Sequence, residues 1–328
     1  MRDLVSLPKA HLHIHLEGGM RTATLADLAC GYGMDVPEIL GFGSFTAFVA
    51  TYGAACGVLQ TPDDLRRLVT ELVEDNARAG AAWVEPAFHP PNHVARLGPN
   101  ETSLEIVLDA LTVAGREHGI GTGLMLSANR TVDPADALGL ARLAVRYKDE
   151  GVVSFGLAND EGPYPPEPFE EAFRLVRDAG ILSTPHAGEL AGPASIVGAL
   201  DALGADRIQH GVRALEDPAL VARLAESGVC LDVCPSSNIA LSVFPSLAEH
   251  PLPALLDAGV RCSINADDPL LFGPNVLEEY ELCRSAFGFD DARLAYIARC
   301  SVTASGAPEA LKQVALAGVD AWLGSSAG

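Results

Sequence analysis

Eight short β-rich runs alternate with amphipathic segments along the 328 residues, and this alternation predicts an α/β fold, a single closed (β/α)8 barrel of the TIM type. Each predicted strand is followed by a segment whose apolar residues recur at helical spacing. Several of these segments end at a glycine, such as Gly119, Gly180 and Gly228, which suits a helix C-terminus. Strands joined in this way are the parallel βα units of a barrel.

The predicted strands, in chain order, span residues 10–16, 83–88, 121–127, 152–157, 182–186, 207–210, 229–233 and 261–265. The predicted helices include residues 63–79, 104–118, 136–148, 168–179, 193–203, 217–227 and 252–258.

One connection is longer than the others. The stretch from Gly18 to Gln60 follows the first strand and holds two helical patterns, 24–32 and 45–59. We expect this insertion to form a helical lid over the barrel mouth. The residues from Asp291 onward are predicted to be closing helices. Because no linker, short-period repeat or low-complexity segment interrupts the chain, residues 1–328 are predicted to form one domain.

Composition and charge exclude several classes of partner. A formal net charge of -21 repels phosphate backbones and anionic lipid, so we expect no nucleic-acid partner. No apolar run reaches 18 residues and no basic-then-apolar leader is visible, which predicts neither a membrane span nor a signal peptide. The seven cysteines are odd in number and lack zinc-finger spacing. The cysteine pattern favours a reduced, cytoplasmic protein. The acidic charge leaves a small molecule as the expected partner.

Three histidines alternate along the first predicted strand. His11, His13 and His15 therefore share one face of that strand. A buried imidazole needs partners for both ring nitrogens, and a bound metal would supply one partner for each ligating ring. The alternative is a stack of histidines hydrogen-bonded to backbone groups.

Polar residues also follow other strands. Residues 13–18, 186–189, 209–211 and 265–269 each end a predicted strand, and a barrel carries its active site at these ends. Three neutral imidazoles and one carboxylate suit Zn²⁺, or alternatively Fe²⁺. The set that can supply them is His13, His15, His186 and Asp267.

The remaining polar groups suit acid–base work. A position left on the metal for water would lower the pKa of that water from about 15.7 toward 7. His210 and Asp268 can hold and deprotonate this water, and Glu189 can deliver a proton to the substrate. Binuclear barrel hydrolases often bridge two metals with a lysine on a middle strand. None of the three lysines (Lys9, Lys148, Lys312) ends the fourth strand, so one metal per chain is predicted.

Five motifs together resemble the adenosine deaminase family over nearly the whole chain. They are Pro8-Lys9-Ala10-His11-Leu12-His13-Ile14-His15-Leu16-Glu17-Gly18, His186-Ala187-Gly188-Glu189, Gln209-His210-Gly211, Cys234-Pro235-Ser236-Ser237-Asn238 and Asn265-Ala266-Asp267-Asp268-Pro269. The resemblance implies a zinc-dependent barrel that hydrolyses the 6-amino group of a purine nucleoside. It implies zinc on His13, His15, His186 and Asp267, protonation of ring N1 by Glu189, assistance to hydroxide by His210, and purine and water contacts by Asp268.

The chain departs from the family pattern at several positions. His11 stands where the family often has glutamate, and we interpret it as structural. Glu17 replaces an aspartate that holds the ribose 5′-hydroxyl, and Asn159 replaces a glycine whose N–H faces purine N3. Arg21, six residues after His15, either reaches the 5′ end of the nucleoside or is an exposed arginine at a helix start.

The leading hypothesis is deamination of adenosine to inosine and ammonia. The rival substrate is a 5′-modified adenosine such as 6-aminodeoxyfutalosine of menaquinone biosynthesis, whose carboxylate Arg21 would grip bidentately. Free adenine ranks below both, because adenine deaminases carry Ser-Ser-Glu at the position of Asn159 and this chain does not. AMP is disfavoured by the net charge and by the missing N-terminal extension. The other hypotheses are an amidohydrolase that cleaves a ring amide, phosphoester or lactone, and a metal-bound barrel that only binds ligand.

Overall fold

The computed structural model describes residues 1–39 and 44–325 of the chain, and each of the eight predicted runs is β-strand in it. The strands are β1 (Lys9–His15), β2 (Ala81–Phe88), β3 (Gly121–Thr122), β4 (Leu124–Asn129), β5 (Val152–Ala158), β6 (Leu182–Ser183), β7 (His186–Ala187), β8 (Arg207–His210), β9 (Cys230–Val233) and β10 (Arg261–Ile264). Two predicted strands are each divided in two. In 182–187 the break includes Pro185, which has no N–H for a strand ladder.

All strand pairs are parallel, and they form two sheets. The first sheet has the order β1-β2-β4-β5-β6, with β3 also pairing with β2, and the second has the order β10-β9-β8-β7. Because β6 and β7 belong to one run of chain, this run contributes to both sheets. A parallel bridge between Ile14 and Asp267 links β1 to the residues that follow β10. The fold is therefore α/β with parallel strands, as predicted.

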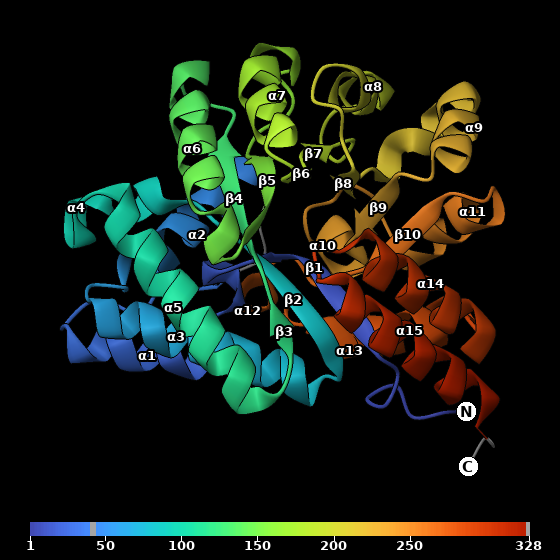
Figure 1. Ribbon diagram of the computed structural model, residues 1–328, viewed down its shortest axis with the longest axis horizontal. Helices are drawn as coiled ribbons and strands as arrows, with labels where there is room; N and C mark the ends of the chain where they lie inside the picture. Colours follow the sequence, from blue (N-terminus) through green and yellow to red (C-terminus); the bar gives the residue numbers. More distant parts are fainter. Residues whose placement is uncertain (40–43, 326–328) are drawn as a thin grey trace.

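The helices surround the strands (Figure 1). They are α1 (Thr22–Gly31), α2 (Phe45–Gly57), α3 (Pro62–Arg78), α4 (Val94–Leu97), α5 (Asn100–His118), α6 (Pro134–Arg146), α7 (Glu170–Asp178), α8 (Pro193–Asp201), α9 (Pro218–Ser227), α10 (Pro235–Ala240), α11 (Leu252–Asp257), α12 (Pro269–Phe272), α13 (Val276–Ala286), α14 (Asp291–Ala304) and α15 (Glu309–Gly324).

Local sequence explains where these helices begin and end. At α3, Thr61 and Asp64 form a reciprocal capping box and Pro62 takes the first turn, where a missing N–H costs nothing. At α9, the Asp217 side chain accepts N–H groups of the first turn, and Gly228 ends the helix in a left-handed conformation. The two patterns expected after the first strand are α1 and α2, and the expected closing helices are α14 and α15. Within the described residues, no helix is long and apolar enough to cross a membrane.

Two large apolar clusters fill the space between strands and helices. One packs α3, α5, α6 and α7 against the first sheet, and the other packs α8, α9, α11 and α14 against the second. Burial of these apolar faces is the main stabilising contribution.

Side chains replace part of the strand ladder where β1 meets the end of β10. The Asn265 carbonyl oxygen (Oδ1) accepts the N–H groups of Leu12 and His13 at 2.8 and 3.1 Å. His11 accepts the Ala266 N–H on Nε2 at 3.1 Å, and its Nδ1 lies 2.7 Å from Oδ1 of Asn76. Both ring nitrogens of His11 are thus hydrogen-bonded within the protein, which agrees with its structural interpretation.

A buried ion cluster joins the two sheets through the interior. Arg207 on β8 lies 2.8 Å from Glu85 on β2 and 3.0 Å from Asp232 on β9, and all three side chains are fully buried. Arg207 also donates to the Ala304 carbonyl, and Trp83 donates to Glu85. Burial raises the pKa of Glu85, but the Arg207 charge and the hydrogen bonds from Arg207, Gly306 and Trp83 together offset this and leave that pKa below its usual value.

We expect Arg207→Met to lower the free energy of unfolding by about 3–5 kcal/mol, because two buried carboxylates would lose their counter-charge. Urea denaturation followed by circular dichroism measures the change. Arg223→Met is the matched control, since Arg223 pairs with Asp201 on the surface, and an exposed pair contributes about 0–1 kcal/mol. A loss below about 1 kcal/mol in the Arg207 variant would contradict a stabilising role for the cluster.

Candidate metal centre and active-site cavity

A cavity of about 320 Å³ opens at the carboxyl ends of the strands. This volume lies within the range of small-molecule sites. Polar groups from several strand ends line it, namely His15, Ser127, Asn129, Asn159, His186, Glu189, His210, Asp267 and Asp268. Helix α2 covers one side with Phe45, Phe48, Val49, Tyr52 and Cys56. The cavity is therefore polar at the strand ends and largely apolar on the side formed by α2.

Two of the histidines are oriented by backbone carbonyl groups. His13 is fully buried, and its Nδ1 lies 3.0 Å from the Asp232 carbonyl oxygen. His186 is oriented in the same way, with Nδ1 3.1 Å from the Leu157 carbonyl oxygen. Because a carbonyl oxygen only accepts, each Nδ1 carries the hydrogen and each Nε2 keeps a free lone pair. This arrangement is typical of metal-ligating histidines.

Asp267 sits between the histidines of β1. Its N–H donates to the His13 carbonyl and its carbonyl accepts the His15 N–H, both at 3.0 Å. Its Oδ1 lies 3.4 Å from His13 Nε2 and 3.3 Å from His15 Nε2. Ser237 donates to Oδ2 at 2.6 Å, which orients the carboxylate. The backbone bridge thus delivers a carboxylate to the same point as the imidazoles.

Left-handed backbone is concentrated at this cavity. Asn159, His210 and Asp267 have φ of 86, 68 and 59°, and all three line the cavity. Non-glycine residues adopt this conformation infrequently, and it recurs at functional sites where the surrounding structure imposes it. Here it turns the chain sharply at three strand ends and directs the side chains inward.

The residues present fit a divalent metal ion. His13, His15 and His186 offer nitrogen atoms within 4.8 Å of one another. In the described part of the chain, the buried Nε2 of His13 has no hydrogen-bond partner, which leaves a lone pair directed at this point. Burial, followed by the nearby His13, lowers the pKa of His186 well below its usual value, so its ring is neutral as a ligand must be.

Glu189 and His210 lie next to the candidate ligands. Oε2 of Glu189 is 3.3 Å from Nε2 of His210. The Asn238 amide lies 3.5 Å from Glu189 Oε1 and 3.3 Å from His210 Nδ1. Burial, followed by the charge of Asp267, raises the pKa of Glu189 well above its usual value. A neutral carboxyl group at this position can donate a proton.

Asp268 presents an unsatisfied carboxyl group to the cavity. Both of its side-chain oxygens are buried without a hydrogen-bond partner among the described residues. Burial, followed by the charge of Asp267, raises the pKa of Asp268 well above its usual value. Gly18 is required beside it, because a Cβ there would lie 1.7 Å from Asp268 Oδ1. A buried carboxyl group without a partner is typical of a site that receives a polar ligand.

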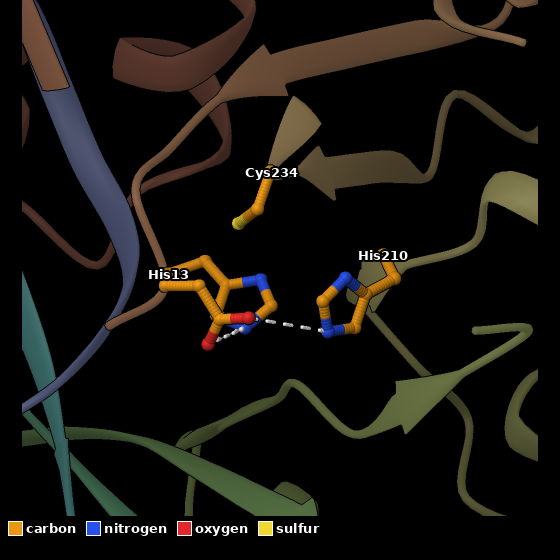
Figure 2. Close-up of side chains that lie close together, drawn as sticks. His13, His210 and Cys234 are labelled. Atoms are coloured by element: carbon orange, nitrogen blue, oxygen red, sulfur yellow. Dashed lines mark ion pairs between the residues drawn. The ribbon is translucent and has the colours of Figure 1, made fainter. Parts of the chain in front are cut away.

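Cys234, for which the sequence predicts no role, lies beside the candidate metal centre. Figure 2 shows its thiol and the rings of His13 and His210 directed toward one space. With Asp267, these groups offer ligand atoms within 4.8 Å of one another. Burial, followed by Asp267, raises the pKa of the Cys234 thiol well above its usual value. A cysteine binds metal as the thiolate, and the raised pKa favours the protonated thiol. The histidines are therefore the better donors here.

The structure separates the four residues expected to contact substrate. Asn159 and Asp268 line the cavity, whereas Glu17 and Arg21 are not among its lining residues. Glu17 is buried, with Oε1 2.6 Å from His93 Nε2 and Oε2 accepting the Tyr52 hydroxyl at 2.7 Å. Arg21 forms ion pairs with Glu74 and Asp75 at 2.6 and 2.7 Å.

The sequence also did not predict which side chains of α2 line the cavity. Phe45, Phe48 and Tyr52 face the cavity from one side of the helix. Their spacing of three and four residues was the available signal, since such residues share a helix face. The sequence does not indicate which surface that face covers.

Comparisons with known proteins agree on one family. The family model described as adenosine deaminase matches residues 8–322. A putative adenosine/adenine deaminase of Streptomyces coelicolor is 48% identical over 98% of both chains. An adenine deaminase of Agrobacterium fabrum is 37% identical and covers 95% of this chain and 97% of its own.

Two solved structures have the same fold. The adenine deaminase of Arthrobacter aurescens matches with a TM-score of 0.91 at 31% identity, over 97% of this chain and 99% of that one. An amidohydrolase of Burkholderia ambifaria with bound Zn matches with a TM-score of 0.89 at 28% identity, over 98% of this chain and 92% of that one.

We expect purified protein to hold about one equivalent of divalent metal, and His13→Ala to lose it, because the substitution removes an oriented ligand. Elemental analysis after dialysis measures the content, and a chelator should lower the melting temperature of the wild-type protein but not that of His13→Ala. The control is His118→Ala at the end of α5, which should keep its metal. A His13→Ala protein with full metal content would exclude His13 as a ligand.

Proposed function

The chain belongs to the adenosine deaminase family, and from this premise we propose that it hydrolyses the 6-amino group of a purine in the cavity described above. One observation supports this proposal above the others. Candidate metal ligands from three parts of the chain lie in the same cavity as a neutral carboxyl donor, Glu189. His210 and Asp268 line this cavity as well. Hydrolytic deamination needs both an activated water and a proton donor.

We propose that one zinc ion binds His13, His15, His186 and Asp267. The fit of three imidazoles, two of them oriented by carbonyl groups, and of the Asp267 carboxylate beside His13 and His15 supports this set, as does the Zn in the Burkholderia relative. When bound, the metal supplies a Lewis acid that lowers the pKa of a water molecule. The protein contributes the carbonyl groups that orient the ligands and the buried surroundings that strengthen electrostatic interactions.

The side chains of the cavity would act on the substrate in sequence. Glu189, as a neutral carboxyl, would donate its proton to ring N1, which weakens the ring's aromaticity and makes C6 electrophilic. His210 would donate from Nε2 to the oxygen that adds to C6, because Asn238 holds its Nδ1 as an acceptor. Asp268, ionised once a bound cation offsets the charge of the neighbouring Asp267, would accept a proton from that oxygen. Asp268 would then pass its proton to the amino group, the C6–N bond would break and ammonia would leave, and the Glu189 carboxylate would take the remaining hydroxyl proton so that a carbonyl group remains at C6.

We also propose that the two sheets are halves of one closed barrel in a single domain, with α1 and α2 as its lid. The run 182–187 contributes to both sheets, and the bridge between Ile14 and Asp267 joins their other edges. Helix α2 covers the cavity, and the Tyr52 hydroxyl ties it to Glu17 beside the metal centre. These contacts support a lid that is closed in this conformation.

Free adenine is the substrate that we propose first. The Glu17 carboxylate is hydrogen-bonded to Tyr52 and His93 and does not line the cavity, so it does not present an acceptor there for a ribose hydroxyl. Arg21 is held by two carboxylates, which removes the residue expected to grip a 5′ carboxylate. Relatives named adenine deaminase are 37% identical to this chain. Adenosine is the second candidate, because Asn92, Asn129 and Arg96 add polar groups to the cavity.

An ammonia-release assay over adenine, adenosine, deoxyadenosine and 6-aminodeoxyfutalosine tests the substrate. We expect kcat/KM to be at least about tenfold higher for adenine than for adenosine, the equivalent of one lost polar contact of about 1.4 kcal/mol. Higher kcat/KM for adenosine would reverse the order of the two candidates. No ammonia from any 6-aminopurine would exclude the proposed reaction.

We expect Glu189→Gln to lose at least about 10²-fold in kcat, because the amide cannot donate an acidic proton to N1. Metal content should be unchanged, since Glu189 is not among the proposed ligands. Steady-state kinetics on the metal-loaded enzyme measures the loss. Glu171→Gln, on the exposed face of α7, is the control and should keep normal kcat. Near-normal kcat in the Glu189 variant would remove this residue from the mechanism.

A further inference from the structure

Residues 186–191, which comprise β7 and the first residues after it and are called the loop below, carry both a proposed metal ligand and the proposed proton donor. His186 begins this loop and Glu189 lies in its middle. A shift of the loop would move both groups together. Misplacement by about 1 Å can cost about 10²-fold in rate, so whatever holds this loop matters for the chemistry.

Arg130, the residue after β4, grips the first part of the loop. Its side chain is 1% exposed, and Nη2 donates to the His186 carbonyl at 2.5 Å. The same nitrogen lies 3.5 Å from the Leu157 carbonyl, which also accepts the ring N–H of His186. The guanidinium therefore contacts both carbonyl groups that determine where the His186 ring points.

Glu161, in the segment after β5, grips the second part of the loop. Its side chain is 3% exposed, and Oε2 accepts the N–H groups of Glu189 and Ala191 at 3.1 and 2.7 Å. Oε1 is 3.4 Å from the Ser195 hydroxyl at the start of α8. The backbone on which Glu189 stands is thus tied directly to a buried carboxylate.

These two buried charges form no ion pair with each other or with another side chain in the part of the chain that the structure describes. Instead, the His186 carbonyl of the loop faces Arg130, together with the carbonyls of Leu157 and Tyr164 outside it, and two loop N–H groups face Glu161. An isolated buried charge is costly unless polar groups surround it. Displacement of the loop would remove the His186 carbonyl from Arg130 and both N–H groups from Glu161, so the two charges oppose such displacement.

Three further carbonyl groups of the loop also accept hydrogen bonds. Gly211 and Arg213 donate their N–H groups to the carbonyls of Ala187 and Gly188, and the Arg213 side chain donates to Leu190. Gly188 is left-handed, with φ of 72°, and a Cβ there would lie 2.4 Å from Ile196. The loop therefore has little freedom to adopt a second conformation.

We propose that Arg130 and Glu161 are positioning residues for the two halves of the site. Arg130 aims the His186 ring at the metal centre, and Glu161 holds the Glu189 backbone so that its carboxyl group faces the substrate. The Glu161 half rests on the proposed deaminase function. The Arg130 half rests only on the metal centre, so the two can fail separately.

The Arg130 half is tested by metal affinity, without any substrate. We expect Arg130→Met to weaken Zn²⁺ binding by about 10–100-fold in competition with a chromophoric chelator, the usual effect of losing a group that orients a ligand. Arg130→Lys keeps the charge but not the planar, forked N–H donors of the guanidinium. Its Zn²⁺ affinity should lie between those of Arg130→Met and the wild type. Arg223→Met, which removes a surface arginine, should bind Zn²⁺ normally. Wild-type affinity in both Arg130 variants would overturn this half.

The Glu161 half is tested by a split between kcat and KM. Glu161→Ala should lose about 10–100-fold in kcat with adenine, while KM changes by less than about threefold and Zn²⁺ content stays constant. Glu161→Gln should recover most of this loss, because its amide oxygen can accept both loop N–H groups. Melting temperatures of both variants separate misfolding from misplacement.

Unchanged kcat in Glu161→Ala would overturn the Glu161 half, and so would a Glu161→Gln protein that is folded but no better than Glu161→Ala. If the wild-type protein releases no ammonia from any purine, the proposed function fails, while the chelator competition still decides the role of Arg130.

Discussion

The backbone bridge between Ile14 and Asp267 is the contact on which both the fold and the site depend. Its two hydrogen bonds tie the end of the second sheet to the first strand of the first sheet. The same two bonds place the Asp267 carboxylate between His13 and His15, within 3.4 Å of each ring. Asn265 and His11 strengthen this seam from either side with side-chain hydrogen bonds. Joining the sheets and assembling the candidate metal centre are therefore one structural event.

Buried charges support the site from two directions. Next to the candidate metal centre, Asp232 pairs with Arg207 through its side chain and orients the His13 ring through its backbone carbonyl. Beside it, Arg130 and Glu161 hold the loop that carries His186 and Glu189. In each case a charged group that would be costly by itself is satisfied only when the backbone is in one arrangement. Rigid placement of catalytic groups is what electrostatic preorganisation requires.

Much of this arrangement could be predicted from the sequence. The alternation of strand and helix patterns located all eight runs of strand, because periods of 2 and 3.6 residues differ enough to be read locally. The histidine, glutamate and aspartate residues after those runs were expected to converge, since parallel strands end at one side of the fold, and His15, His186, Glu189 and Asp267 do line one cavity. The roles of Arg130 and Glu161 could not be read in this way. Their partners are backbone atoms of a loop some 30 to 60 residues away, and backbone atoms leave no mark on residue type.

Glu17 shows what the sequence determines and what only the tertiary structure decides. Residue types and their spacing determined the strand pattern, the chemistry of the metal set and the membership of a family, because these properties belong to short segments and to their order. They did not determine the partner of Glu17. The motif places a carboxylate two residues after His15, but Tyr52 on α2 and His93 after β2 occupy both of its oxygens. Which distant side chain meets a buried carboxylate depends on how whole helices pack over the strands, and only the tertiary structure decides that.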